Sequence, residues 1–205
     1  MWNLAASGCA FVALAAATGC GSNSSKSATV ATTQPATKSA KTTPTPPVTT
    51  TFGEISLTSA AFKNGGQIPV RYTCDGAGVS PPLQWQKIPA GAEELFLVAL
   101  ELRGSVASGK GATIQWAVGG IQPHDGQIAA GTLPPGAAVG VNSAGKAAWA
   151  GLCGSKGTRH HVAFLIYALR KKLHLKTGFN PNETRKRFKG TGLATGLTLA
   201  SYLRP

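Results

Sequence analysis

Acidic side chains are scarce in this chain, whose 205 residues contain seven aspartates and glutamates against twenty lysines and arginines. Few carboxylates are therefore available for acid–base catalysis. The chain contains no Gly-x-Ser-x-Gly elbow and no phosphate-loop pattern. Its histidines and cysteines form no cluster at the spacing of a metal site. These absences predict a protein that is not an enzyme and that holds no metal or other cofactor.

The apolar run at the N-terminus, from Leu4 to Ala17, is shorter than the roughly 20 residues that a membrane-spanning helix needs, and it is typical of a signal peptide. It leads into Ala-Thr-Gly-Cys, which resembles the cleavage box of a bacterial lipoprotein. We therefore predict a signal peptide at 1–19 and a diacylglycerol group on the thiol of Cys20. The protein would then be exported and anchored to the cell membrane, facing outside the cytoplasm. A cleaved, secreted protein and an uncleaved anchor are the alternatives.

The segment after the signal peptide, residues 20–53, consists mostly of Ser, Thr, Ala, Pro and Lys. This composition buries too little apolar surface to offset the entropy lost on ordering the chain. We therefore predict a disordered tether at 20–53 and one folded domain at 54–205.

Positive charge is concentrated in the C-terminal third, where residues 142–205 hold twelve basic side chains and one acidic side chain. Two clusters dominate it, around 170–176 and 185–189. Anionic lipid headgroups or acidic polymers of the envelope are the partners expected for such a surface on an exported domain. Nucleic acid is not expected, because no aromatic platform or binding motif accompanies the charge, and no protein partner can be named. A solvated face that keeps the protein soluble is the alternative.

Hydrophobic patterning favours short strands separated by glycine- and proline-rich turns. Strands are expected at 54–57, 68–72, 95–100, 114–118 and 161–169. A helix is expected at about 184–189. The apolar pattern of 193–203 fits a helix in part and a terminal strand in part, and both stay open. The domain is therefore predicted to be mainly β with minor helices.

Two short motifs resemble a known family. Residues 72–76 read Tyr-Thr-Cys-Asp-Gly, and residues 80–85 read Ser-Pro-Pro-Leu-Gln-Trp. Both are similar to the signature of the phosphatidylethanolamine-binding protein (PEBP) family, in its bacterial YbhB/YbcL or Raf-kinase-inhibitor-like branch. The resemblance covers roughly residues 54–204. It implies a two-sheet antiparallel core, β-rich with some α structure, and short helices at the periphery and toward the C-terminus.

The resemblance also implies a cleft for phosphate-like oxyanions, built in the family from aspartates, a His-Trp pair, a cysteine-containing turn and a second histidine. Here a glutamate stands near the aspartate positions, and Gln115-Trp116 replaces the His-Trp pair. The turn 151–155 keeps its cysteine without its prolines. Glutamine donates hydrogen bonds but cannot become cationic. The ligand-binding residues implied are His160, Glu101, Gln115, Trp116, Arg159 and Asp75.

Structural interpretations stand beside these functional ones. His160 is alternatively a histidine whose ring only bonds a backbone carbonyl, and Trp116 is alternatively a core residue. Asp75 is alternatively the cap of a turn. His161 is expected to point to the opposite face of its strand from His160, and we assign it no role.

Cysteine positions add one covalent prediction. Exported members of the resembled branch also place cysteines at the positions of Cys74 and Cys153. An oxidising setting favours pairing of these two residues. The resemblance therefore implies a disulfide that closes a loop of roughly 80 residues. A reactive thiol is the alternative.

Taken with the predicted export, these features predict a membrane-tethered, non-enzymatic binding protein for an anionic small molecule or a phospholipid headgroup. The altered cleft leaves a second hypothesis open. In that case the protein is an envelope interaction module, or an inhibitor of a kinase or protease, that binds no small ligand.

Overall fold

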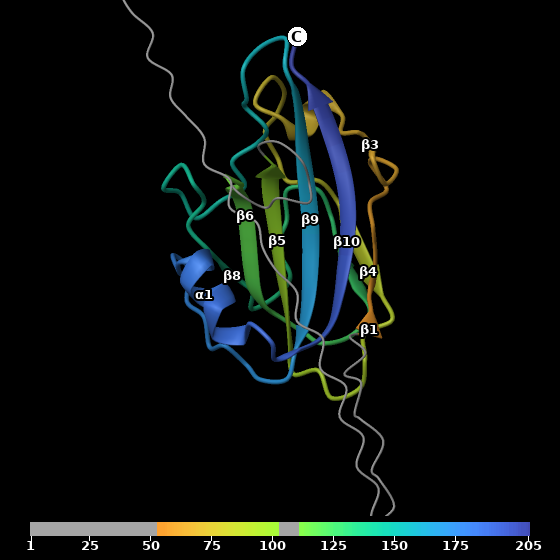
Figure 1. Ribbon diagram of the computed structural model, residues 1–205, viewed down its shortest axis with the longest axis vertical. Helices are drawn as coiled ribbons and strands as arrows, with labels where there is room; N and C mark the ends of the chain where they lie inside the picture. The colour runs from red at the N-terminus through yellow and green to blue at the C-terminus, as the bar shows by residue number, and fades with distance from the viewer. Residues whose placement is uncertain (1–52, 103–110) are drawn as a thin grey trace, which may run out of the picture. The chain divides into compact units, whose positions relative to one another are not determined.

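The computed structural model describes residues 53–102 and 111–205 (Figure 1). The predicted signal peptide, the predicted lipidation site at Cys20 and all of the predicted tether except Gly53 lie outside these residues. Gly53 is the first residue of the first strand. Within the described residues, no helix has both the length and the apolar character needed to cross a membrane.

The described chain forms ten strands, a short 3-10 helix η1 and an α-helix. In chain order these are β1 (Gly53–Glu54), β2 (Ser56–Thr58), β3 (Gly66–Gln67), η1 (Val70–Tyr72), β4 (Leu83–Gln86), β5 (Glu94–Leu102), β6 (Thr113–Ile121), β7 (Gly126–Ile128), β8 (Ala138–Val139), β9 (Arg159–Leu169), α1 (Pro181–Phe188) and β10 (Gly192–Leu203).

The strands build two sheets. The larger has the order β1-β10-β9-β5-β6-β8, with β3 also pairing with β10, and the smaller has the order β2-β4-β7. All pairs are antiparallel except those that β1 and β3 make with β10. The prediction of a mainly β fold with two sheets is therefore confirmed.

The larger sheet is buried on both faces along β5, where residues 95–99 are fully buried. One face packs against the smaller sheet through Leu97, Phe164 and Trp85. The other face packs against α1 through Phe96 and Phe188, whose rings lie 5.2 Å apart. Because both faces of β5 are buried, its sequence is an unbroken apolar run.

The prediction of a strand at 68–72 is wrong. Only Gly66–Gln67 pairs with β10, and after Pro69 the chain turns into η1. The amide of Tyr72 donates to the carbonyl of Pro69 at 3.0 Å. Ile68 and Tyr72 are both buried, so a tight turn presents the same apolar residues to the core as a strand would.

The predicted helix begins three residues too late. Asn180 is its N-cap, because its side chain accepts from the amides of Asn182 and Glu183, and Pro181 occupies the first helical position. Asparagine followed by proline is a start signal for a helix, and the sequence analysis did not use it. The segment left open at 193–203 is strand β10, with no helical part.

Candidate functional site

Three strands bring polar side chains to one end of the larger sheet. Glu101 lies near the end of β5, while Gln115 and His160 lie near the starts of β6 and β9. Because β5 runs antiparallel to both neighbours, these three positions meet at the same edge. The structure therefore brings together three of the residues predicted from the sequence.

A β-bulge aims Gln115 into this group. Ala99 pairs with Trp116 and Leu100 pairs with Ile114, so Gln115 has no partner in the ladder. Bulges re-aim side chains in this way. The amide nitrogen of the Gln115 side chain donates to Glu101 Oε2, and the backbone carbonyl of Gln115 accepts from the amide of Ala150 at 2.9 Å.

Glu101 and His160 form the centre of the group. Glu101 Oε1 lies 2.7 Å from His160 Nδ1, and the two side chains are 12% and 15% exposed. The other ring nitrogen, Nε2, lies 3.2 Å from the carbonyl oxygen of Ser155, which can only accept. A ring that donates from both nitrogens is the cationic form. The arrangement therefore suits a carboxylate–imidazolium pair without net charge.

These side chains line an open cleft of about 470 Å³. Four residues of the turn 151–155 also line it, namely Gly151, Cys153, Gly154 and Ser155. No backbone–backbone hydrogen bond between described residues has an amide N–H of 151–155 as its donor. These amides therefore have no backbone acceptor among the described residues, and free backbone N–H groups are a kind of donor that can bind oxyanions.

The turn fits the imidazole closely because residue 154 is glycine. A Cβ atom placed on Gly154 would lie 1.6 Å from His160 Cε1, so a side chain there would displace the ring. Gly151 has φ +70° and faces the backbone at Cys74. Glycine at position 154 therefore leaves the room that the His160 ring occupies.

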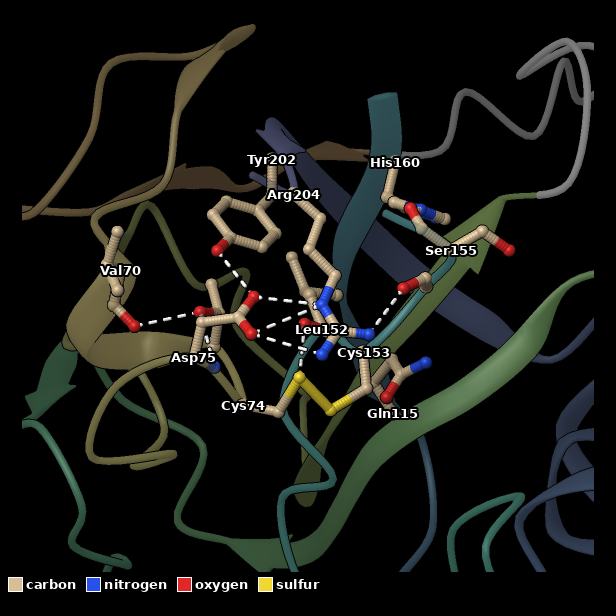
Figure 2. The surroundings of a disulfide bond; sticks show 12 residues. Val70, Cys74, Asp75, Gln115, Leu152, Cys153, Ser155, His160, Tyr202 and Arg204 are labelled. Carbon is tan, nitrogen blue, oxygen red and sulfur yellow. Dashed lines mark hydrogen bonds and ion pairs between the residues drawn. A yellow bond between two sulfur atoms is a disulfide. The ribbon is translucent and has the colours of Figure 1, made fainter. Parts of the chain in front are cut away.

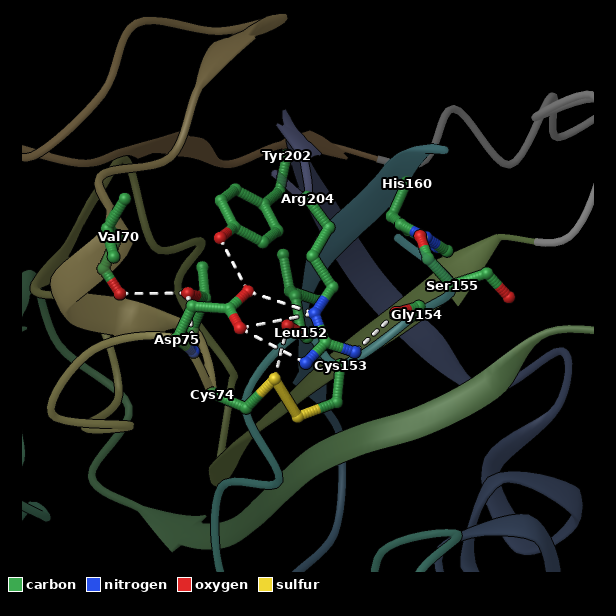
Figure 3. A network of polar contacts seen from close by, with 11 residues as sticks. Val70, Cys74, Asp75, Leu152, Cys153, Gly154, Ser155, His160, Tyr202 and Arg204 are labelled. Carbon is green, nitrogen blue, oxygen red and sulfur yellow. Dashed lines mark hydrogen bonds and ion pairs between the residues drawn. A yellow bond between two sulfur atoms is a disulfide. The ribbon is translucent and has the colours of Figure 1, made fainter. Parts of the chain in front are cut away.

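Asp75 acts beside the cleft and does not line it. Its carboxylate accepts from the Tyr202 hydroxyl at 2.7 Å and from Nε and Nη2 of Arg204 at 3.1 Å (Figure 3). Nη1 of Arg204 donates to the carbonyl of Gly154 at 2.8 Å, so Arg204 links Asp75 to the turn. The Tyr202 hydroxyl and the Arg204 guanidinium hold the pKa of Asp75 below its ordinary value.

The predicted disulfide between Cys74 and Cys153 is present (Figure 2). It joins the chain after η1 to the cleft turn, and Cys153 itself lines the cleft. Three connections to distant parts of the sequence therefore hold the turn. They are this disulfide, the hydrogen bond from Arg204 to the carbonyl of Gly154, and the hydrogen bond from the amide of Ala150, just before the turn, to the carbonyl of Gln115.

The two remaining predicted residues lie outside the cleft lining. Trp116 is 2% exposed and packs edge-on against Trp149 at 6.1 Å in the core between the sheets. Arg159 is exposed, and its Nη1 lies 3.5 Å from the Ser201 hydroxyl. Within the described residues, no group of three His, Cys, Asp or Glu side chains is arranged to hold a metal ion.

A family model described as phosphatidylethanolamine-binding protein matches residues 58–203. This chain belongs to the PEBP family. The matched region contains every strand from β3 to β10, and it confirms the resemblance drawn from the two short motifs.

Relatives of this PEBP-family chain are found in bacteria and archaea. A protein of Mycobacterium tuberculosis named as a candidate lipoprotein, LppC, is 40% identical over 125 residues, which make up 60% of this chain and 60% of LppC. The match to LppC thus spans less than two thirds of that protein. A UPF0098 protein of Methanothermobacter thermautotrophicus is 32% identical over 155 residues, covering 73% of this chain and 99% of that protein.

Solved structures show the same fold. The PEBP homolog CT736 of Chlamydia trachomatis is 28% identical with a TM-score of 0.67, and the match covers 75% of this chain and 99% of CT736. YbcL of Escherichia coli is 23% identical with a TM-score of 0.66, and the match covers 75% of this chain and all of YbcL. The YbcL match supports the fold alone.

Sequence reasoning missed Arg204 and the roles of Gly154 and Ser155. Arg204 lies 129 residues from its partner Asp75, and no local pattern relates the two. The glycine at 154 was noted as a lost proline, while its contact with the His160 ring depends on how β9 packs against the turn.

Proposed function

We propose that this PEBP-family protein is an exported, membrane-anchored, non-enzymatic binding protein whose cleft takes an anionic small molecule or a phospholipid headgroup. One observation carries the proposal. Glu101, Gln115 and His160 line one open cleft of about 470 Å³ together with four residues of the turn 151–155. Imidazole and backbone N–H groups bind oxyanions by hydrogen bonds, and no bond to the ligand has to form or break.

Glu101 refines the class of ligand. Because its carboxylate lies 2.7 Å from His160 Nδ1, a bare anion beside the imidazole would also meet a negative charge. A ligand with both a phosphate and an ammonium group suits the cleft better. The phosphate would meet the turn amides and the imidazole, and the ammonium would meet Glu101. The headgroup phosphoethanolamine has this chemistry.

Membrane anchoring rests on the N-terminal sequence. The small residues before Cys20 are those of a lipoprotein cleavage box, and a relative of this chain is named as a candidate lipoprotein. A diacylated Cys20 would hold the cleft outside the cytoplasm, close to phospholipid.

The test combines native mass spectrometry of the protein purified from an exporting host with titration of phosphoethanolamine and of inorganic phosphate. The wild type is expected to bind phosphoethanolamine saturably. His160→Ala should weaken binding by about tenfold or more, because it removes a charge-assisted hydrogen bond. Gly154→Ala should do the same while keeping the imidazole, because the added Cβ displaces the ring.

His161→Ala is the matched control, since His161 is an exposed neighbour of His160 on β9 that points to the other face of the sheet. It should bind like the wild type. If neither probe binds, or if the His160 and Gly154 variants bind as well as the wild type, the cleft is not the receptor we propose.

The second candidate function is an envelope interaction or inhibitor module without a small ligand. The observation that favours it is that both ring nitrogens of His160 already have partners, in Glu101 and Ser155. On this hypothesis the protein carries no ligand by native mass spectrometry, and it co-purifies from membranes with a protein partner that His160→Ala also retains.

A further inference from the structure

The sheet end opposite the cleft carries most of the positive charge. β9 ends there and β10 begins there (Figure 1), and α1 packs through Phe188 against Tyr167 near the end of β9. The connecting stretch with α1, residues 170–189, holds eight lysines and arginines and one glutamate, for a net charge of +7. We call this region, residues 170–195 together with Tyr167, the basic end.

A pocket of about 410 Å³ opens in the basic end between α1 and the strands β9 and β10. Tyr167 and Phe188 supply the aromatic side chains of its lining, here called the apolar floor, and Arg185 and Lys189 supply the cationic side chains, here called the basic rim. The rings of Tyr167 and Phe188 lie 5.4 Å apart, which fixes the floor. An apolar floor beside two cations has the chemistry to bind an amphiphilic molecule with an anionic headgroup.

The two rim cations differ from their neighbours on the helix. Lys186 is paired with Glu183 at 2.8 Å, and Arg187 donates to the carbonyl of Leu173 at 3.3 Å. Neither Arg185 nor Lys189 has a carboxylate within ion-pair distance among the described residues, which include all seven acids of the chain.

An apolar strip extends from the pocket along the outer face of the sheet. Leu197 on β10 is 48% exposed and pairs across the ladder with the half-buried Leu165 on β9. Thr195 pairs with Tyr167 in the same way, so strip and pocket are continuous. Helix α1 covers Phe96 on the neighbouring strand β5, and in the described residues it does not cover Leu197.

The first described strand lies at this same place. Gly53 of β1 pairs with Ala194, and Glu54 pairs with Thr195, and both partners line the pocket. Glu54 is the one acid of this strand and is exposed. It reduces the positive charge of the basic end without reversing it.

We propose that the basic end docks onto a bilayer surface containing anionic phospholipid. Arg185 and Lys189 would meet headgroup phosphates, and the apolar floor and strip would lie against the boundary between headgroups and acyl chains. This proposal concerns a second site and does not depend on ligand binding in the cleft. His160 and Tyr167 are seven residues apart on β9, about 23 Å at the rise of a strand, so the docked domain turns its cleft away from the surface.

The test is vesicle co-sedimentation of the full chain, with vesicles of phosphatidylcholine alone and with about one third phosphatidylglycerol. Arg185→Glu with Lys189→Glu should weaken binding to the anionic vesicles by about tenfold or more. Lys63→Glu with Arg71→Glu is the matched control, because it changes net charge equally at exposed sites away from the basic end. It should weaken binding by less than about threefold. The apolar run 4–17 is present in every variant, so its contribution cancels.

Several outcomes would overturn the proposal. Equal losses in the two double variants would mean that only net charge matters. Equal binding to both kinds of vesicle would mean that anionic lipid is not recognised. A loss with His160→Ala as large as that of the Arg185 and Lys189 variant would place membrane binding in the cleft. Dimerisation without vesicles that the Arg185 and Lys189 variant abolishes would identify a second copy of the chain as the occupant.

Discussion

The two ends of the larger sheet differ in how their charged side chains are paired. The cleft end holds two ion pairs, Glu101 with His160 and Asp75 with Arg204, and the exposed Arg159 there has no carboxylate partner among the described residues. At the basic end the charges are mostly cations without acidic partners, and they surround an aromatic cluster. Both ends rest on the same long strands β9 and β10.

This difference in charge pairing suits the two ends to the two different kinds of recognition that we propose for them. Paired charges cancel at long range, so the cleft distinguishes ligands only by contacts at hydrogen-bond distance. Unpaired cations act over roughly a Debye length, about 8 Å at physiological salt, and attract any anionic surface. The cleft end therefore suits selective binding of one small molecule, and the basic end suits orientation on a surface.

The largest expected effect comes from removing the disulfide that supports the cleft end. Cys74→Ser with Cys153→Ser removes the disulfide, which spans a sequence separation of 79 residues. The free energy of unfolding should fall by about 4 kcal/mol on the chain-entropy model. Phosphoethanolamine binding should weaken as well, because the turn 151–155 loses an attachment. Urea unfolding and titration of the folded variant measure the two effects, and a loss below about 1 kcal/mol would contradict the first.

The next effect tests the basic end alone. Phe188→Ala removes a ring that packs on Phe96 and Tyr167, and it should lower the free energy of unfolding by about 3 kcal/mol. Because the cleft shares no contact with this ring, phosphoethanolamine binding by the folded variant should stay within about twofold of wild type. A loss of cleft binding as large as that of His160→Ala would show that the two ends are coupled.

The smallest effect concerns the acid dependence of the cleft end. The pKa of Asp75 lies below 3.8 in the folded protein, so its contribution to stability is present at neutral pH and is lost as pH falls through that lowered pKa. Asp75→Asn should therefore flatten the rise of stability with pH below about pH 4. Tyr202→Phe should flatten it in part, since the Tyr202 hydroxyl is the main cause of the shift. Urea midpoints between pH 2 and pH 5 measure both, and unchanged slopes would contradict the assignment.

Much of the fold was predictable because its signals are local. The buried runs of β5 and β9 and the turn residues around them identify a mainly β domain. Two short motifs, at 72–76 and 80–85, then identify its family. Errors arose where two local structures bury the same residues, as at Ile68 and Tyr72, or where a cap signal such as Asn180 was not used.

The site was predictable in its residue types and less so in its geometry. Glu101, Gln115 and His160 meet as expected. The bulge that aims Gln115 is a feature of pairing between strands, however, and no periodicity within β6 reveals it. Asp75 illustrates the same limit, because its partner Arg204 is distant in the sequence and its effect on the cleft passes through Gly154.

The bulge at Gln115 also bears on how the cleft can change over time. A residue without a partner in the strand ladder can be exchanged for another of similar size while the hydrogen bonds of its neighbours remain. A substitution at position 115 can therefore change the lining of the cleft without breaking the hydrogen bonds between β5 and β6. The pairing of Ala99 with Trp116 and of Leu100 with Ile114 does not involve residue 115, so a different side chain there would alter the cleft and leave that pairing in place.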